Sequence, residues 1–165
     1  MELYLIRHGI AADRDAYEND EERPLTDKGH DKTAKVAKQL RDRGLRFDLI
    51  LTSPLVRAKE TATILKEAGL AARVEEFAAL APDGDIQAWV NWLEKRQQTS
   101  PGDKSLALVG HQPDLGNWAE TLVWGKAQNK LLLKKAGVIG LTSPDTKPLI
   151  GQSELFLLLS PKWLL

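Results

Sequence analysis

The chain has 165 residues, of which 42% are hydrophobic and 28% are charged, and these values predict one ordinary soluble domain over residues 1–165. Lysine and arginine together number 23, as do aspartate and glutamate, so the formal net charge is zero, which argues against a general role in binding nucleic acid or membranes. Cysteine is absent, which excludes disulfides and thiolate chemistry and fits a reducing, cytoplasmic location.

The first quarter of the chain predicts a strand, a loop and a helix. The apolar run Leu3–Ile6 is typical of a short buried strand. It is too short for the core of a signal peptide, and no apolar run approaches the roughly 20 residues that span a bilayer. The acidic stretch from Ala11 to Pro24 lacks periodicity, so we expect a surface loop. Thr26 then suits the N-cap of a helix that Gly44 ends.

The middle of the chain repeats this alternation. A second strand is predicted within Asp48–Ser53, and Pro54 suits the first turn of the helix that follows. A weaker strand at Arg73–Glu75 precedes a helix for which Asp85 is the expected N-cap. The polar stretch Gln97–Asp103 is then expected to form a loop.

The last third predicts one more strand and helix, followed by a different pattern. Leu106–Val109 is a clear buried strand, and Pro113 opens a helix that runs toward Gly125. Three short apolar runs then predict strands that form either the edge of the same sheet or a hairpin beside it: Leu131–Leu133, Val138–Leu141 and Leu155–Leu159. The whole pattern predicts a three-layer α/β/α fold with a largely parallel sheet between helices.

Polar residues follow three of the predicted strands. The first strand ends in Arg7 and His8, the second leads to Arg57 in the next helix, and the fourth ends in His111. Ligands of open α/β sheets bind beyond the carboxyl ends of the strands. Two histidines and two arginines therefore converge at one edge, provided that these three strands are neighbours.

This set of side chains suits a phosphoryl group. Arginine presents fixed donors that match phosphate oxygens, and it stays charged at any useful pH. Neutral imidazole is a good nucleophile near neutral pH, and positioned cations lower the barrier by stabilising charge on the phosphoryl oxygens. Gly9 removes a Cβ atom where the chain turns beside His8. We therefore interpret this edge of the sheet as a phosphoryl-transfer site in which a histidine is the nucleophile.

Four motifs resemble, in order, those of the histidine phosphatase superfamily, which also holds the cofactor-dependent phosphoglycerate mutases. They are Leu5-Ile6-Arg7-His8-Gly9, Pro24–Gly29, Ser53–Ala62 and Val109-Gly110-His111. The resemblance covers about residues 3–116. It implies a phosphoglycerate mutase-like fold that lacks the large insertions of the mutases.

The short length and the segment Gly110–Leu115 are similar to the small SixA-type phosphohistidine phosphatases. That resemblance implies that His8 forms a covalent phosphohistidine and that Arg7, Arg57 and His111 complete the phosphate pocket. The implied substrate is a phosphorylated protein, such as a phosphotransfer domain of a signalling relay, or else a small phosphorylated compound. We expect no cofactor and no metal ion, because the histidines are widely spaced and the arginines would repel a cation.

The remaining site residues are less constrained by the motifs. Arg7 could instead anchor the acidic loop at Asp20-Glu21-Glu22, and Arg23 could be either a pocket residue or a surface charge. The residues expected to contact the substrate are Gly9, Ser53, Gln112 and Arg23.

The general acid is the point at which the sequence departs from the larger family. Most members carry a glutamate or aspartate beyond the third strand, where this chain offers only Asp83 and Asp85. Asp83 is a possible acid, and Glu60 is a poorer one. By the same resemblance, small members work without this acid, since a phosphoramidate releases a neutral imidazole after proton uptake at nitrogen.

Two further functions stay open. A small-molecule phosphomonoesterase could use the same pocket, but an ester has a poorer leaving group and requires a general acid near Asp83. A non-catalytic module that binds phosphate or phosphopeptides is the other alternative, and it would be expected to have lost a pocket residue, whereas none is missing here.

Overall fold

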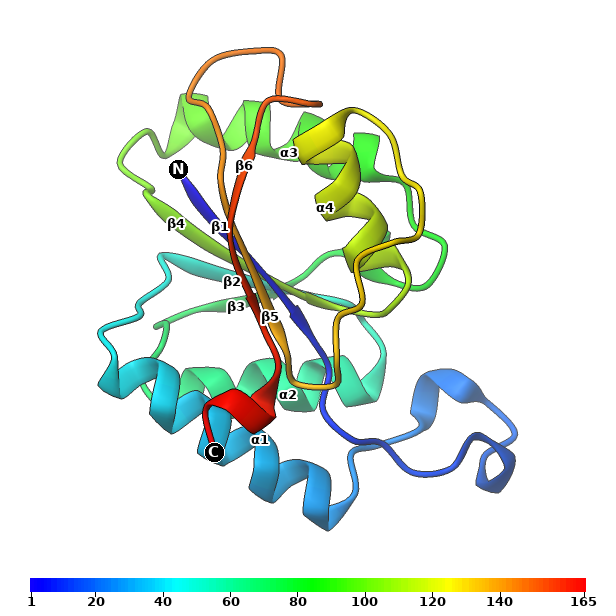
Figure 1. The fold of residues 1–165 in the computed structure, drawn as a ribbon. Helices are drawn as coiled ribbons and strands as arrows, with labels where there is room; N and C mark the ends of the chain where they lie inside the picture. The colour runs from blue at the N-terminus through cyan, green and yellow to red at the C-terminus, as the bar shows by residue number, and fades with distance from the viewer.

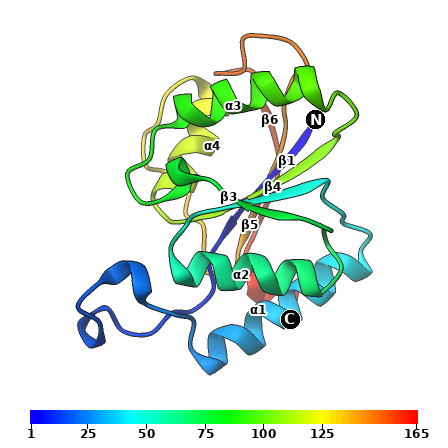
Figure 2. The same cartoon turned by 180° about the vertical axis from the view of Figure 1, so that it is seen from behind.

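A six-stranded sheet runs through the computed structural model, which describes residues 1–165, and helices cover both of its faces (Figures 1 and 2). The strands are β1 (Glu2–Arg7), β2 (Leu49–Thr52), β3 (Val74–Glu76), β4 (Ser105–Gly110), β5 (Val138–Thr142) and β6 (Glu154–Leu159). The helices are α1 (Asp27–Asp42), α2 (Val56–Glu67), α3 (Ile86–Thr99) and α4 (Asp114–Trp124). Short 3-10 turns are η1 (Arg14–Ala16), η2 (Asp20–Glu22), η3 (Ala78–Leu80) and η4 (Pro161–Trp163).

The strand order is β3-β2-β4-β1-β5-β6. Strands β1 to β4 are parallel to one another. At one edge of the sheet, β5 runs antiparallel to β1, and β6 runs antiparallel to β5 and therefore in the direction of β1. The predicted α/β fold with a largely parallel sheet is therefore confirmed. Because β2, β4 and β1 are adjacent, their carboxyl ends meet at one edge of the sheet, as the convergence of the site residues requires.

Alternation along β1 divides the core into two layers. Leu3 and Leu5 pack on the face covered by α3 and α4, whereas Tyr4 and Ile6 pack on the face covered by α1 and α2. Successive strand residues point to opposite faces, so a strand buried on both sides must be apolar at every position. This is why Leu3–Ile6 is a continuous apolar run rather than an alternating one.

The predicted helix ends are confirmed where a side chain or a glycine sets them. The Thr26 hydroxyl accepts a hydrogen bond from the Gly29 N–H at 2.9 Å and begins α1, and Asp85 caps α3 in the same way. Gly125 ends α4 with a φ of 91°, in the left-handed region that glycine adopts without strain.

Two predicted helix boundaries are wrong by a few residues. Pro54 lies before α2 rather than in its first turn, because the Ser53 hydroxyl accepts the N–H of Leu55 and closes a turn ahead of the helix. The predicted loop from Gln97 begins only after Thr99, since polar side chains do not by themselves end a helix.

The predicted strand at Leu131–Leu133 is not formed. These residues cross the carboxyl edge of the sheet without strand pairing, and their carbonyl groups accept hydrogen bonds from side chains. Leu131 O accepts from Gln112 Nε2 at 2.7 Å, and Leu133 O accepts from Arg7 Nη1 at 3.0 Å. The chain therefore enters β5 beside the end of β1 and has to run back antiparallel to it. This places the last strands in the same sheet, which settles the alternative left open above.

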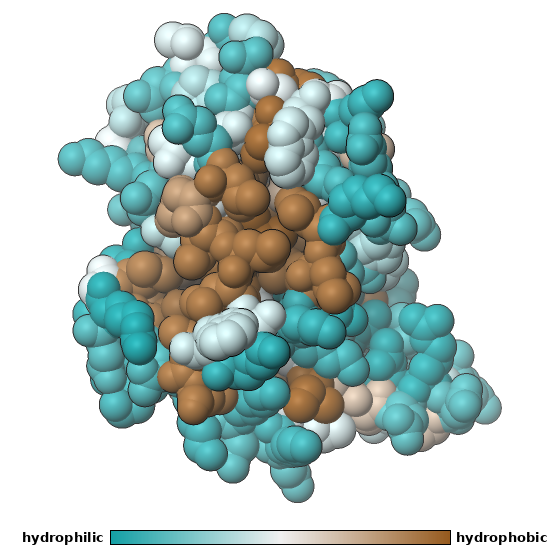
Figure 3. All heavy atoms as spheres, in the orientation of Figure 1, coloured by the Kyte–Doolittle hydropathy of each residue, from teal (hydrophilic) through white to brown (hydrophobic).

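The β5–β6 side of the sheet is the one least covered by helices. Apolar residues gather over β5 and β6 in the space-filling view (Figure 3). On β6, Phe156 and Leu158 are each 48% exposed and alternate with half-buried neighbours, as expected for an edge strand with one solvent-facing side. None of the helices combines the length and the apolar composition needed to cross a membrane.

Candidate active site

A cavity of about 450 Å³ opens at the carboxyl ends of β1, β2 and β4. It brings together Arg7, His8, Arg57 and His111, the four side chains that the sequence predicted to converge. Five of its lining residues are cationic and two are carboxylates, so it carries an excess of positive charge. The full lining is Arg7, His8, Arg14, Arg23, Arg57, Pro82, Asp83, His111, Gln112, Pro113, Asp114 and Lys135.

His8 lies just beyond the end of β1, where its backbone N–H bonds to Gly110 O of β4 at 3.0 Å. The ring nitrogen Nδ1 lies 2.7 Å from the carbonyl oxygen of Gly9, which can only accept, so Nδ1 carries the proton. The lone pair of the neutral ring is therefore on Nε2. Burial, together with the charges of nearby Arg57 and Arg7, lowers the pKa of His8 to about 3.

His111 lies beyond the end of β4, and its ring centroid is 5.2 Å from that of His8. Its Nε2 is 2.8 Å from the hydroxyl oxygen of Ser53, and its Nδ1 is buried without a partner. Burial first, and then the Arg57 charge, lowers the pKa of His111 to about 4. Both imidazoles are consequently neutral at physiological pH.

The two predicted arginines are each tied down on one side. Arg7 Nη1 donates to Leu133 O, so Arg7 does not anchor the acidic loop. Arg57 does so instead, because its two terminal nitrogens donate to the backbone oxygen and the carboxylate of Asp20 at 2.8 and 2.9 Å. Burial lowers the pKa of both guanidinium groups, which nevertheless remain charged near neutral pH.

Three buried donors of the site have no hydrogen-bond partner within the protein. They are Arg7 Nε, Arg57 Nε and His111 Nδ1. Buried polar groups are normally paired, and each unpaired one costs about 1–3 kcal/mol. Guanidinium N–H groups that stay unpaired in a cationic cavity are suited to an oxyanion with several acceptor oxygens, and His111 Nδ1 adds a third donor in the tautomer that protonates it.

Gly9 and Ser53 support the site from behind and do not line the cavity, contrary to their expected contact with substrate. The Gly9 N–H donates to the Thr61 hydroxyl at 3.0 Å, which links the turn after β1 to α2. Ser53 is completely buried and lies behind His111. Both residues therefore hold the histidine rings in place. Arg23 and Gln112 do line the cavity, as predicted.

The carboxylates considered as possible general acids lie differently from what the sequence predicted. Asp83 lines the cavity but is exposed, and its N–H donates to Asp114 Oδ2 at 3.0 Å. Burial, followed by the charge of Asp83, raises the pKa of Asp114 above its ordinary value. Glu60 is not among the lining residues of the cavity and bonds to His30 at 2.6 Å.

The sequence reasoning missed three charged cavity residues, Arg14, Asp114 and Lys135, besides the two prolines Pro82 and Pro113. Asp114 lies in the quoted segment after His111, and its place in the first turn of a helix that leaves the site could have marked it. Arg14 and Lys135 lie in stretches without periodicity, where no pattern predicts the path of the chain. No group of three or more histidine, aspartate or glutamate side chains is arranged to hold a metal ion.

Comparisons with known proteins identify the family and the fold. A sequence profile of the histidine phosphatase superfamily (branch 1) matches residues 3–81. Phosphohistidine phosphatase SixA of Escherichia coli (strain K12) is 32% identical over 120 residues, which cover 70% of each chain. A protein of Picosynechococcus sp. (strain ATCC 27264), described only as uncharacterized, is 53% identical over 100% of this chain and 99% of its own. A solved structure of the protein histidine phosphatase SixA complexed with tungstate superposes with a TM-score of 0.85 at 25% identity, covering 99% of both chains.

Proposed function

The chain belongs to the histidine phosphatase superfamily and is a phosphatase, and we propose that it removes the phosphoryl group from phosphohistidine on another protein. The observation that carries the proposal is the state of His8. Its Nδ1 proton is engaged by Gly9 O, so its Nε2 lone pair is free within a cavity lined by five cations. The SixA relatives, named as phosphatases of phosphohistidine, support the same substrate class.

The first step transfers the phosphoryl group to the enzyme. The lone pair of His8 Nε2 attacks phosphorus and forms a P–N bond, while the P–N bond of the substrate breaks. The departing imidazole nitrogen keeps the electron pair of that bond and takes up a proton from solvent, leaving as a neutral ring. The unpaired donors of Arg7, Arg57 and His111 stabilise the charge on the phosphoryl oxygens in the transition state.

The second step returns the enzyme to its starting state. A water molecule attacks the phosphorus of the phosphohistidine on His8, and the bond to Nε2 breaks with its electron pair returning to the ring. Inorganic phosphate leaves, and the proton of the attacking water passes to solvent or phosphate. Because the pKa of His8 is about 3, Nε2 does not take up a second proton near neutral pH, and the ring remains nucleophilic for the next turnover.

One observation favours a second candidate, which is a phosphatase for small phosphate esters. Asp114 is a half-buried carboxyl group of the cavity, and its pKa is raised by burial. An alkoxide leaves with difficulty unless it receives a proton, and a carboxyl group with a raised pKa is the usual donor. The two candidates therefore differ in whether Asp114 takes part in the chemistry.

Replacing the nucleophile tests the histidine mechanism. His8→Ala is expected to reduce phosphate release from a phosphohistidine peptide to background and to abolish the phosphoenzyme trapped by rapid acid-free quenching. His30→Ala is the matched control, because His30 is an exposed histidine of α1 that does not line the cavity. A His8→Ala enzyme with full activity would rule the mechanism out.

A substrate panel separates the two candidates. The wild-type kcat/KM is compared between a phosphohistidine peptide and a set of small phosphate esters, and the comparison is repeated with Asp114→Asn. Asparagine keeps the acceptor for the Asp83 N–H but cannot donate an acidic proton. The proposed function predicts preference for the peptide and a change below about threefold in the variant. Preference for esters, with a loss of about 10²–10⁴-fold in the variant, would establish the second candidate.

A further inference from the structure

The cavity that holds Arg7, His8, Arg57 and His111 is called the phosphate cavity below. A second cavity of about 550 Å³ lies directly beside it. The two share Arg7 and Lys135, so they are adjoining parts of one depression. Five of the residues around the second cavity are cationic and none is acidic. Its lining consists of Arg7, Ile10, Lys32, Lys134, Lys135, Ser160, Pro161 and Lys162.

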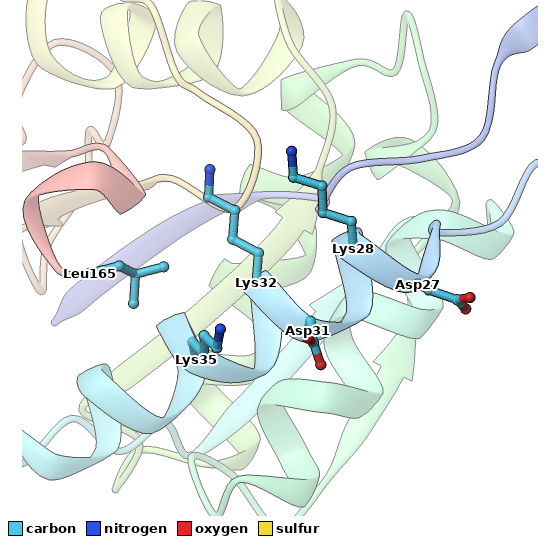
Figure 4. Close-up of a pocket in the computed structure, with 6 residues that line it drawn as sticks. All are labelled: Asp27, Lys28, Asp31, Lys32, Lys35 and Leu165. Carbon is cyan, nitrogen blue, oxygen red and sulfur yellow. The ribbon is translucent and has the colours of Figure 1, made fainter.

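The depression continues along α1. A third hollow of about 500 Å³ shares Lys32 with the second cavity and is lined further by Lys28, Lys35 and Leu165 and by two carboxylates, Asp27 and Asp31. These lysines are spaced by four and three residues, so they lie on one face of the helix and extend over about 10 Å of its length. In Figure 4, Lys28 and Lys32 extend to one side of α1, whereas Asp27 and Asp31 point away from them. We refer to the two hollows beyond the phosphate cavity as the basic groove.

The lysines of the basic groove have no anionic partner within the protein. None of Lys28, Lys32, Lys35, Lys134, Lys135 and Lys162 forms an ion pair or a side-chain hydrogen bond, although the chain has as many acidic as basic residues. Of the eight other lysines, Lys38, Lys59 and Lys147 each lie 2.8–3.1 Å from a carboxylate oxygen, and five form no ion pair. The groove is therefore distinguished by the gathering of six unpaired lysines on one surface, at the cost of repulsion among like charges.

The composition of the groove indicates what kind of anion it fits. Its cations are flexible lysines, which pair with carboxylates in varied positions, rather than a set of arginines that would grip one phosphate in fixed geometry. No aromatic ring is among the lining residues of either hollow, although the centroid of the exposed Trp163 ring lies 5.0 Å from Lys162 Nζ at the margin. Its two parts extend the depression well beyond the space that a single phosphoryl group occupies.

We propose that the basic groove binds an acidic segment of the phosphoprotein substrate, rich in aspartate and glutamate, while the phosphohistidine occupies the adjoining cavity. This inference rests on the proposed function, and it names the class of protein that the site accepts. Carboxylates beside the phosphohistidine pair with the unpartnered lysines, which speeds encounter and lengthens the bound state. The groove thereby selects among phosphoproteins without taking part in the chemical step.

The test uses two phosphohistidine peptides of equal length and one small compound. One peptide carries glutamate on both sides of the phosphohistidine, the other carries glutamine at the same positions, and the compound is N-phosphoimidazole. The variant is Lys32→Gln/Lys134→Gln/Lys162→Gln, which leaves the residues of the phosphate cavity unchanged. The control is Lys66→Gln/Lys95→Gln/Lys126→Gln, which removes the same charge from exposed lysines outside the groove.

The wild-type enzyme is expected to prefer the glutamate peptide by about tenfold in kcat/KM at low salt, and to lose this preference as ionic strength rises. The groove variant is expected to lose the preference while keeping wild-type activity toward N-phosphoimidazole, which also reports that it is folded. The control variant is expected to behave as wild type. Equal wild-type kcat/KM values for the two peptides, or an undiminished preference for the glutamate peptide in the groove variant, would contradict the proposed role of the basic groove. Inactivity of the wild type toward all three phosphoramidates would instead overturn the proposed function.

Discussion

The two histidines of the site are held neutral by the same surroundings that bind an anion. His8 and His111 are nearly buried, and the arginines beside them add positive charge. Both effects disfavour imidazolium, so the lone pair of His8 is retained while the guanidinium groups remain charged. Histidine thus provides neutral rings with an available lone pair in a cavity whose net charge is positive, as the proposed mechanism requires.

The same pair predicts how stability depends on pH. Their folded-state pKa values of about 3 and 4 lie below the ordinary value of about 6.5, so the unfolded chain takes up protons first as the pH falls. The stability that the neutral rings confer is complete above about pH 6.5 and declines toward pH 4. When the pH falls from 7 to 5, each histidine should lower the free energy of unfolding by about 2 kcal/mol.

Urea unfolding at the two pH values, in buffers free of phosphate, measures this effect. His8→Asn/His111→Asn removes both titrating rings and should lose about 4 kcal/mol less than wild type between pH 7 and pH 5. An identical pH dependence in the two proteins would show that the rings are not held neutral in the folded state.

At the level of elements, the site depends on how closely α1 approaches the turn after β1. A Cβ atom built on Gly9 would lie 2.3 Å from the Thr33 hydroxyl oxygen of α1, far inside van der Waals contact. On the other side of the turn, the Gly9 N–H is held by Thr61 of α2. Two helices therefore fix the backbone that carries His8, and glycine is required because of this packing rather than because of its φ angle.

Gly9→Ala is expected to lower the unfolding free energy by about 1–3 kcal/mol and to reduce kcat, because the turn or α1 has to move. Gly102→Ala is the matched control, since a Cβ atom there meets nothing within 4 Å. Thermal unfolding and phosphatase assays give both readouts.

Adding Thr33→Ala to Gly9→Ala removes the atom responsible for the clash, and the double variant should recover part of the loss. Thr33 Oγ1 has no hydrogen-bond partner, so its removal breaks no bond. A double variant as damaged as Gly9→Ala alone would contradict this explanation.

At the level of the whole molecule, the phosphate cavity joins parts of the chain that are far apart in sequence. Its lining comes from the ends of β1 and β4, the start of α2, the loop before α1 and the segment before β5. An oxyanion bound there contacts several elements at once, so binding stabilises the folded chain as a whole.

Tungstate or orthovanadate, at about 100 times its dissociation constant, is expected to stabilise the protein by about 2.7 kcal/mol and to raise Tm by roughly 5–10 °C. Differential scanning fluorimetry with increasing oxyanion measures the shift. Arg57→Ala should lose most of the shift, whatever its own starting Tm, and Lys66→Ala should retain it. A full shift in Arg57→Ala would place the anion elsewhere.

Much of this architecture was determined by local sequence. The continuous apolar runs of β1 and β4 predict strands buried on both faces, and Thr26 and Gly125 mark helix ends through hydrogen bonding and φ preference. Because parallel strands place their carboxyl ends at one edge, the residues that follow them predict a shared site. These features depend on short-range chemistry or on periodicity, so they could be found without coordinates.

Long-range contacts decided the rest. Leu131–Leu133 has the composition of a strand, yet its carbonyl groups accept hydrogen bonds from the side chains of Arg7 and Gln112. The reason is that the chain crosses the edge of the phosphate cavity before it reaches β5. The pairing of Arg57 with Asp20 and the place of Ser53 behind His111 likewise depend on the packing of distant segments. The basic groove is of the same kind, since its lysines come from α1, the segment before β5 and the turn η4. The sequence by itself predicted which four side chains, Arg7, His8, Arg57 and His111, meet in the cavity. Only the tertiary structure decided which residues support them and that the basic groove adjoins the cavity, because no local pattern encodes which distant segments meet.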